Sequence, residues 1–133
     1  MEITSKKHEI NAKVERVILF LSDLNNIEKL LPKDKISEWK SDTDNCSFKV
    51  QNTATISLIK KEVGENKIHM TSGEKSPFPF KLDVNITENG EGSFGEIHFD
   101  GEVNAFLKMM VERPLTSLFD YMSEKLKIEM EKS

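Results

Sequence analysis

The spacing of apolar residues changes twice along this chain, and the order of these changes limits the folds that it can adopt. Apolar residues first recur at helical spacing within residues 14–31, then at every second position within 36–103, and finally at helical spacing again within 107–126. A helix buries a residue every three or four positions, whereas a half-buried strand buries every second one. The sequence therefore predicts an α+β protein, with a curved antiparallel sheet wrapped around a long C-terminal helix and two short helices after the first strand.

The first 32 residues predict a strand followed by the two short helices. After a strand within residues 2–10, one helical face is formed by Val14, Val17, Ile18 and Leu21. Asn11 is expected to cap this helix, because its side-chain oxygen can accept from an N–H one turn further on. Asp23 or Asn25 is expected to cap the second helix, and Pro32 to end it.

The middle of the chain predicts strands that each have one apolar and one polar face. The inward residues are Cys46, Phe48 and Val50; Ala54, Ile56 and Leu58; Ile68 and Met70; Phe78, Phe80, Leu82, Val84 and Ile86; and Ile97, Phe99, Gly101 and Val103. Asn89-Gly90-Glu91-Gly92 is typical of a tight hairpin between the last two strands. Such alternation is typical of an antiparallel sheet that is covered on one side.

The last segment supplies the cover. Its apolar stripe is Leu107, Val111, Leu115, Leu118, Met122 and Leu126. Met110 is expected at the edge of the core, whereas Phe106 and Met109 turn toward the charged side. Pro114 falls on the stripe, so it either kinks one helix and frees the carbonyl of Met110, or is the first residue of a new helix.

Composition excludes several kinds of partner. The 133 residues carry a net charge of −4 without a basic patch, which argues against nucleic-acid binding. Cys46 is the only cysteine, and the three histidines are scattered, so we predict neither a disulfide, nor a metal site, nor a cofactor. The longest apolar run, residues 17–21, is too short for stable membrane insertion, and the N-terminus has no signal core. We expect a cytoplasmic protein.

The order of residues in the first third resembles that of a known superfamily. The matching residues are Ile10-Asn11-Ala12, Val17, Phe20-Leu21-Ser22-Asp23 and Leu31-Pro32. They resemble the opening of small bacterial members of the START-like superfamily, also called Bet v 1-like or polyketide cyclase/dehydrase-like (SRPBCC) proteins. The later strands and the Met-rich last helix agree with that layout. Residues 1–133 are therefore expected to form a single START-like domain with the helix-grip fold.

The resemblance implies a deep cavity between the sheet and the C-terminal helix. It also implies a small hydrophobic ligand in that cavity, namely a lipid, quinone, sterol or polyketide-like molecule. The expected lining residues are Trp39, Phe48, Ile56, Met70, Phe78, Phe80, Leu82, Ile97, Phe99, Met110, Pro114 and Tyr121. The hydroxyl of Tyr121 is the best candidate for a polar anchor. The superfamily shares no catalytic motif, so no catalytic residue carries over.

Two other functions stay open. A cyclase or dehydratase would need an acid or base in the cavity, and strand alternation points His69 and His98 to solvent instead. A register slip at Gly95 or Gly101 would reverse that orientation. A protein-interaction module would show an exposed apolar patch around the two off-stripe residues of the last helix. A homodimer is a further alternative.

Overall fold

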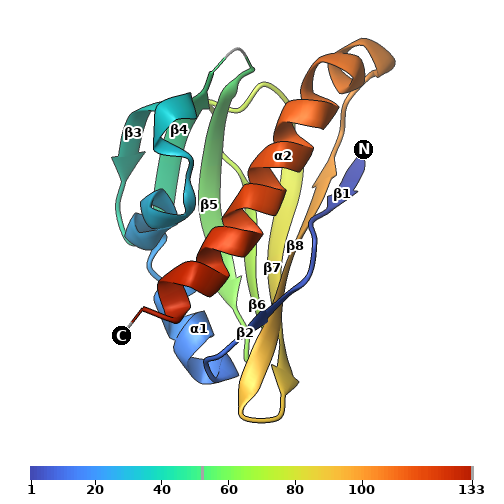
Figure 1. Cartoon of the computed structure of the whole chain (residues 1–133). Helices are drawn as coiled ribbons and strands as arrows, with labels where there is room; N and C mark the ends of the chain where they lie inside the picture. The colour runs from blue at the N-terminus through green and yellow to red at the C-terminus, as the bar shows by residue number, and fades with distance from the viewer. Residues whose placement is uncertain (52, 133) are drawn as a thin grey trace.

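In the computed structural model, which describes residues 1–51 and 53–132, eight antiparallel strands form one curved sheet, and the helix α2 (Ala105–Met130) lies across one face of it (Figure 1). The strands are β1 (Glu2–Thr4), β2 (His8–Ile10), β3 (Ile36–Ser41), β4 (Asn45–Val50), β5 (Thr55–Val63), β6 (Lys67–Ser72), β7 (Phe80–Asn89) and β8 (Gly92–Gly101). Their order in the sheet is β1-β8-β7-β6-β5-β4-β3, and β2 also pairs with β8. The predicted fold class is confirmed.

The shorter helices lie between β2 and β3. They are α1 (Val14–Leu21) and the 3₁₀ helices η1 (Leu24–Leu30) and η2 (Lys33–Lys35). The four residues of the predicted α1 face are all buried. The carboxylate of Asp23 accepts a hydrogen bond from the N–H of Asn25 at 3.0 Å, so the predicted cap of the second helix is confirmed. That helix has 3₁₀ geometry and ends before Pro32.

The predicted cap at Asn11 is wrong, because α1 begins later than expected. Lys13 occupies the N-cap position, and its side chain makes no capping hydrogen bond. The backbone N–H of Asn11 donates instead to the carboxylate of Glu131, at the C-terminal end of α2, at 2.9 Å. Residues 2–10 also form two strands rather than one, because Ser5 leaves the regular pairing and exchanges hydrogen bonds with Ile97 of β8.

The strand faces agree with the predicted alternation. The inward residues of β4 to β8 are buried, while Ala54 and Val103, which lie outside the strands, are only partly buried. In the β7–β8 hairpin, Asn89 pairs with Gly92, and Gly90 adopts a positive φ of 60°, as a two-residue turn requires. The irregularities of register lie elsewhere than predicted: β3 is irregular after Ser37, and β5 is irregular between residues 60 and 62.

The helix α2 is continuous through Pro114, so the predicted alternative of a break is wrong. Asn104 caps it, its side-chain oxygen accepting from the N–H of Leu107 at 2.8 Å. The stripe from Val111 to Leu126 is buried as predicted. Met110, however, is 55% exposed, so its expected place at the core edge is wrong. Residues 105–110 are exposed except for half-buried Leu107, so the start of α2, at the upper right in Figure 1, lies outside the packed interior.

Buried serine side chains tie the N-terminal segment to the rest of the molecule. The hydroxyl of Ser123 in α2 donates to the carbonyl of Lys6 at 2.9 Å, and the hydroxyl of Ser93 in β8 donates to the carbonyl of Ala12 at 2.9 Å. Both serines are almost fully buried. These bonds satisfy carbonyl groups at points where the segment leaves the sheet.

Candidate functional site

A groove runs along the side of α2. Two of the predicted ligand-binding residues, Pro114 and Tyr121, line it. It encloses about 450 Å³ between α2 and the region around the end of β4. On the helix side it is lined by Arg113, Pro114, Ser117, Leu118 and Tyr121, and on the other side by Pro32, Lys35, Val50, Gln51 and Thr53. We call it the α2 groove.

No helix within residues 1–51 and 53–132 is long and apolar enough to cross a membrane.

Backbone contacts hold the wall opposite the helix in place. The N–H of Gln51 donates to the carbonyl of Lys35 at 2.8 Å, which joins the end of β4 to η2. The N–H of Val50 donates to the carbonyl of Ala54 at 2.9 Å. The hydroxyl of Thr53 donates to the carbonyl of Gln51 at 3.2 Å. This wall is therefore built by ordinary hydrogen bonding of the strand ends.

The α2 groove is continuous with the core of the protein. Val50 and Leu118 line it, and both are buried members of the apolar core. Phe48 lies two residues from Val50 on the same face of β4, and Trp39 stacks on it with ring centroids 5.9 Å apart. The indole N–H of Trp39 donates to the hydroxyl of Ser41, so its polar atom is satisfied.

The predicted ligand-binding residues fall into three places. Eight are buried in the core: Phe48, Ile56, Met70, Phe78, Phe80, Leu82, Ile97 and Phe99. Trp39 packs against the core and is partly buried. Pro114 and Tyr121 line the α2 groove. Met110 lies outside both the core and this groove.

Aromatic rings fill part of the space between the sheet and α2. Phe80 and Phe99 have ring centroids 5.0 Å apart, and Phe78 meets both of these rings edge-on. From the helix side, Phe119 reaches Phe99, with ring centroids 5.2 Å apart. Rings at these separations are in direct contact. A ligand in this part of the interior would have to displace at least one of them.

The three polar side chains buried among the described residues are Ser5, Ser93 and Ser123. His69 and His98 both lie on the face of the sheet turned away from α2, as predicted. His69 pairs across the sheet with Asp83 at 2.5 Å, and His98 lies 3.4 Å from the carboxylate of Glu2. None of the buried serines is an acid or base, whereas the imidazole Nε2 of half-buried His8 is a buried atom without a hydrogen-bond partner among residues 1–51 and 53–132.

The other chemically reactive group is the thiol of Cys46. Its side chain is buried in β4, and the loss of hydration raises its pKa to about 12, with a smaller contribution from the negative charge of Asp42. A thiol with such a pKa is a poor nucleophile and a poor metal ligand at neutral pH. Within the described residues, no three histidine, cysteine or acidic side chains gather in a way that would hold a metal ion.

Sequence reasoning missed two kinds of residue. Phe119 belongs to the α2 stripe, since it follows Leu115 by four positions and precedes Met122 by three, and that spacing was enough to find it. Val50 and Pro32 come together at the α2 groove through tertiary structure. Alternation predicted that Val50 faces inward, but no local pattern marks the two residues as neighbours.

Comparison of the sequence with models of protein families gave no match, and neither did comparison with curated protein sequences. Solved structures, in contrast, resemble it over nearly the whole chain. The KanY protein has a TM-score of 0.78 at 18% identity, covering 98% of this chain and 97% of its own. A START superfamily protein from Mycobacterium smegmatis has a TM-score of 0.70 at 14% identity, with 98% and 97% covered.

A conserved protein from Geobacillus kaustophilus is similar as well, with a TM-score of 0.72 at 16% identity, covering 100% of this chain and 97% of its own. Identities this low establish the shared fold. The chain therefore has the START-like, or Bet v 1-like, helix-grip fold.

Proposed function

We propose that the protein binds a small hydrophobic molecule, which enters through the α2 groove and rests against the apolar surface between the sheet and α2. The observation that carries this proposal is the continuity of the groove with the core through Val50 and Leu118. The fold supports it, since the START-like resemblance implies a ligand held between these same two elements. Burying ligand carbon supplies the driving force, about 25 cal/mol per Å² of apolar surface.

The polar groups of the groove indicate how a ligand would be oriented. Tyr121 is 40% exposed at the groove, so its hydroxyl is accessible to a ligand. Lys35 and Arg113 place two cationic side chains on opposite walls. A few polar groups around an apolar site commonly determine the orientation of a ligand. An amphiphile with an acidic or carbonyl head group and an apolar tail fits this arrangement.

Native mass spectrometry of the purified protein, followed by organic extraction, tests for a bound molecule. Oleic acid, decylubiquinone and cholesterol then serve as probes in a titration followed by amide NMR shifts. Ser117→Trp places an indole in the groove from an exposed position of α2, and Glu124→Trp is the matched control on the same helix outside it. We expect Ser117→Trp to weaken binding of the preferred probe at least roughly tenfold, and the control to leave it unchanged.

Two results would count against the proposal. One is a clean apo mass together with no shift for any of the three probes. The other is equal weakening by both tryptophan variants, which would place the ligand elsewhere.

A further inference from the structure

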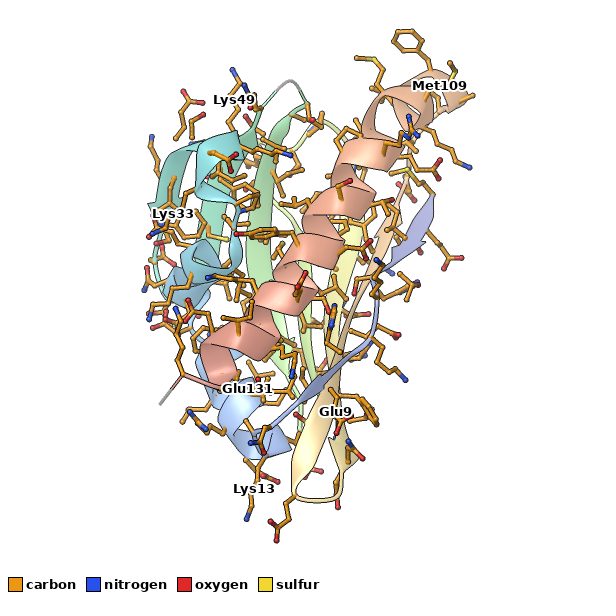
Figure 2. All side chains as sticks on the ribbon, viewed as in Figure 1. Glu9, Lys13, Lys33, Lys49, Met109 and Glu131 are labelled. Carbon is orange, nitrogen blue, oxygen red and sulfur yellow. The ribbon has the colours of Figure 1, made fainter. Side chains whose placement is uncertain are left out.

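A second groove lies at the other end of the molecule, between α1 and the β7–β8 hairpin (Figure 1). It encloses about 810 Å³, and none of its lining residues also lines the α2 groove. Figure 2 marks its position by Lys13, at the end of the molecule opposite Met109. We call it the α1 groove. It is a separate site from the one proposed for the hydrophobic ligand.

Part of the lining of the α1 groove is apolar and accessible to solvent. Leu19 is 74% exposed and Val63 is 45% exposed, next to the buried side chains of Val14 and Ile18. The irregularity in β5 brings Val63 to this side of the sheet, since it pairs Val63 with buried Ile68. Paired residues of antiparallel strands share a face. Without that shift, the end of β5 would present a glutamate here.

The charged part of the lining is acidic. It consists of Lys13 together with Glu15, Glu65, Glu88 and Glu91. The four glutamates come from α1, from the β5–β6 turn and from the β7–β8 hairpin, so they surround the apolar side chains from separate elements. Within residues 1–51 and 53–132 none of these carboxylates forms an ion pair. The groove thus presents four carboxylates against one ammonium group.

This combination of charge and apolar surface selects the occupant. Nucleic acid and anionic membranes would be repelled by the carboxylates. A symmetric contact between two copies of the chain would place the same four glutamates against each other, in a protein whose net charge is already −4. A segment that offers lysine or arginine side chains around an apolar anchor would match both features.

We propose that the α1 groove binds a short basic, amphipathic segment of a partner protein. An apolar side chain of that segment would lie against Leu19 and Val63, and its basic side chains would meet the surrounding glutamates. Burial of the anchor would supply most of the affinity. The charges would raise the association rate and exclude acidic competitors.

A capped pentapeptide of alternating lysine and leucine is the probe, titrated into the ¹⁵N-labelled full chain at low salt. Glu88→Gln/Glu91→Gln removes two carboxylates of the groove. Glu74→Gln/Glu102→Gln removes two exposed carboxylates elsewhere and has the same net charge. Leu19→Ser removes the apolar contact, with Met109→Ser as its control at the far end of α2. All four changes lie at exposed positions, so folding is retained.

We expect amide shifts confined to α1 and residues 63–66 and 88–92. We also expect Glu88→Gln/Glu91→Gln and Leu19→Ser each to weaken binding roughly fivefold or more, while both controls bind like the wild type. The proposal is overturned by no binding at millimolar peptide, or by shifts outside the groove. It is also overturned by equal weakening in the two carboxylate pairs, which would show general attraction to an acidic protein, or by equal affinity for spermidine, which would show a site for small cations.

Discussion

The ring of Phe119 in α2 lies against the ring of Phe99 in β8, with centroids 5.2 Å apart, and this contact joins the helix to the strand next to the β1 edge of the sheet. Both side chains are almost fully buried. Through Phe99, the helix is connected to Phe80 at the start of β7 and to Phe78 just before it. This aromatic cluster fills part of the space between the sheet and α2.

Replacing Phe119 with a small residue is expected to destabilise the protein. Phe119→Ala removes a buried ring and leaves a cavity against Phe99, so it should lower the free energy of unfolding by about 3–5 kcal/mol. Urea unfolding followed by circular dichroism measures the difference. Met109→Ala, at an exposed position of the same helix, should change it by less than about 0.5 kcal/mol. A loss below about 1 kcal/mol for Phe119→Ala would mean that the cluster packs loosely.

Introducing a charge should lower the stability of the protein strongly at one predicted ligand-binding position and hardly at all at another. Phe80 is buried among aromatic rings, so Phe80→Glu places a carboxylate where nothing can pair with it and should cost more than about 4 kcal/mol. Met110 is 55% exposed, and Met110→Glu should cost less than about 0.5 kcal/mol. Thermal unfolding midpoints of the two variants and the wild type measure these differences in stability. Similar losses in both would mean that Met110 is covered in solution.

The hydroxyl of Ser123 is expected to stabilise the N-terminal segment. Ser123→Ala removes one of the two hydroxyl donors to the carbonyl of Lys6, because Ser5 also donates to it at 3.0 Å, and it should lower the free energy of unfolding by about 1 kcal/mol. Ser117→Ala is the matched control, since it changes the same residue type at an exposed position of α2 and shares any gain in helix propensity. Chemical denaturation of both variants gives the difference. Equal stabilities would show that the remaining hydrogen bond from Ser5 is enough for the carbonyl of Lys6.

The thiol of Cys46 predicts a dependence of stability on alkaline pH. Its pKa is raised to about 12 in the folded protein, so the native thiol stays protonated while the unfolded one ionises above about pH 9. Stability from this group is therefore complete below pH 9 and falls by about 1.4 kcal/mol per pH unit as the pH rises toward 12. The measurement compares urea midpoints of the wild type and Cys46→Ala between pH 8 and pH 10.5.

If the stability of the wild type falls with pH no more steeply than that of Cys46→Ala, the raised pKa of the Cys46 thiol is contradicted. The same burial should protect the thiol from a disulfide reagent at pH 8 in the native state, with full reaction after unfolding. Rapid labelling of the native protein would show that β4 opens locally.

Much of the fold follows from local patterns. The alternation of β4 to β8, the stripe of α2, the turn at Gly90 and the cap at Asp23 were all predicted from residues close together in the chain. The missed features depend on distant partners. Asn11 does not cap α1, because the helix begins at Val14 with Lys13 at its N-cap, and the N–H of Asn11 instead meets Glu131 at the other end of the chain. Met110 is exposed because the start of α2, which carries it, lies outside the packed interior.

The candidate site shows the same division. The sequence determined which side chains face the interior, because hydrophobic period is a local property that only one secondary structure and one face can satisfy. Tertiary structure alone decided that Pro114 and Tyr121 meet Val50 in the α2 groove. It also decided that a shift of register in β5 brings Val63 beside Leu19 and the glutamates of the α1 groove. Grooves form where separate elements end or diverge, and the distance between such ends depends on packing across the whole chain rather than on spacing within one segment.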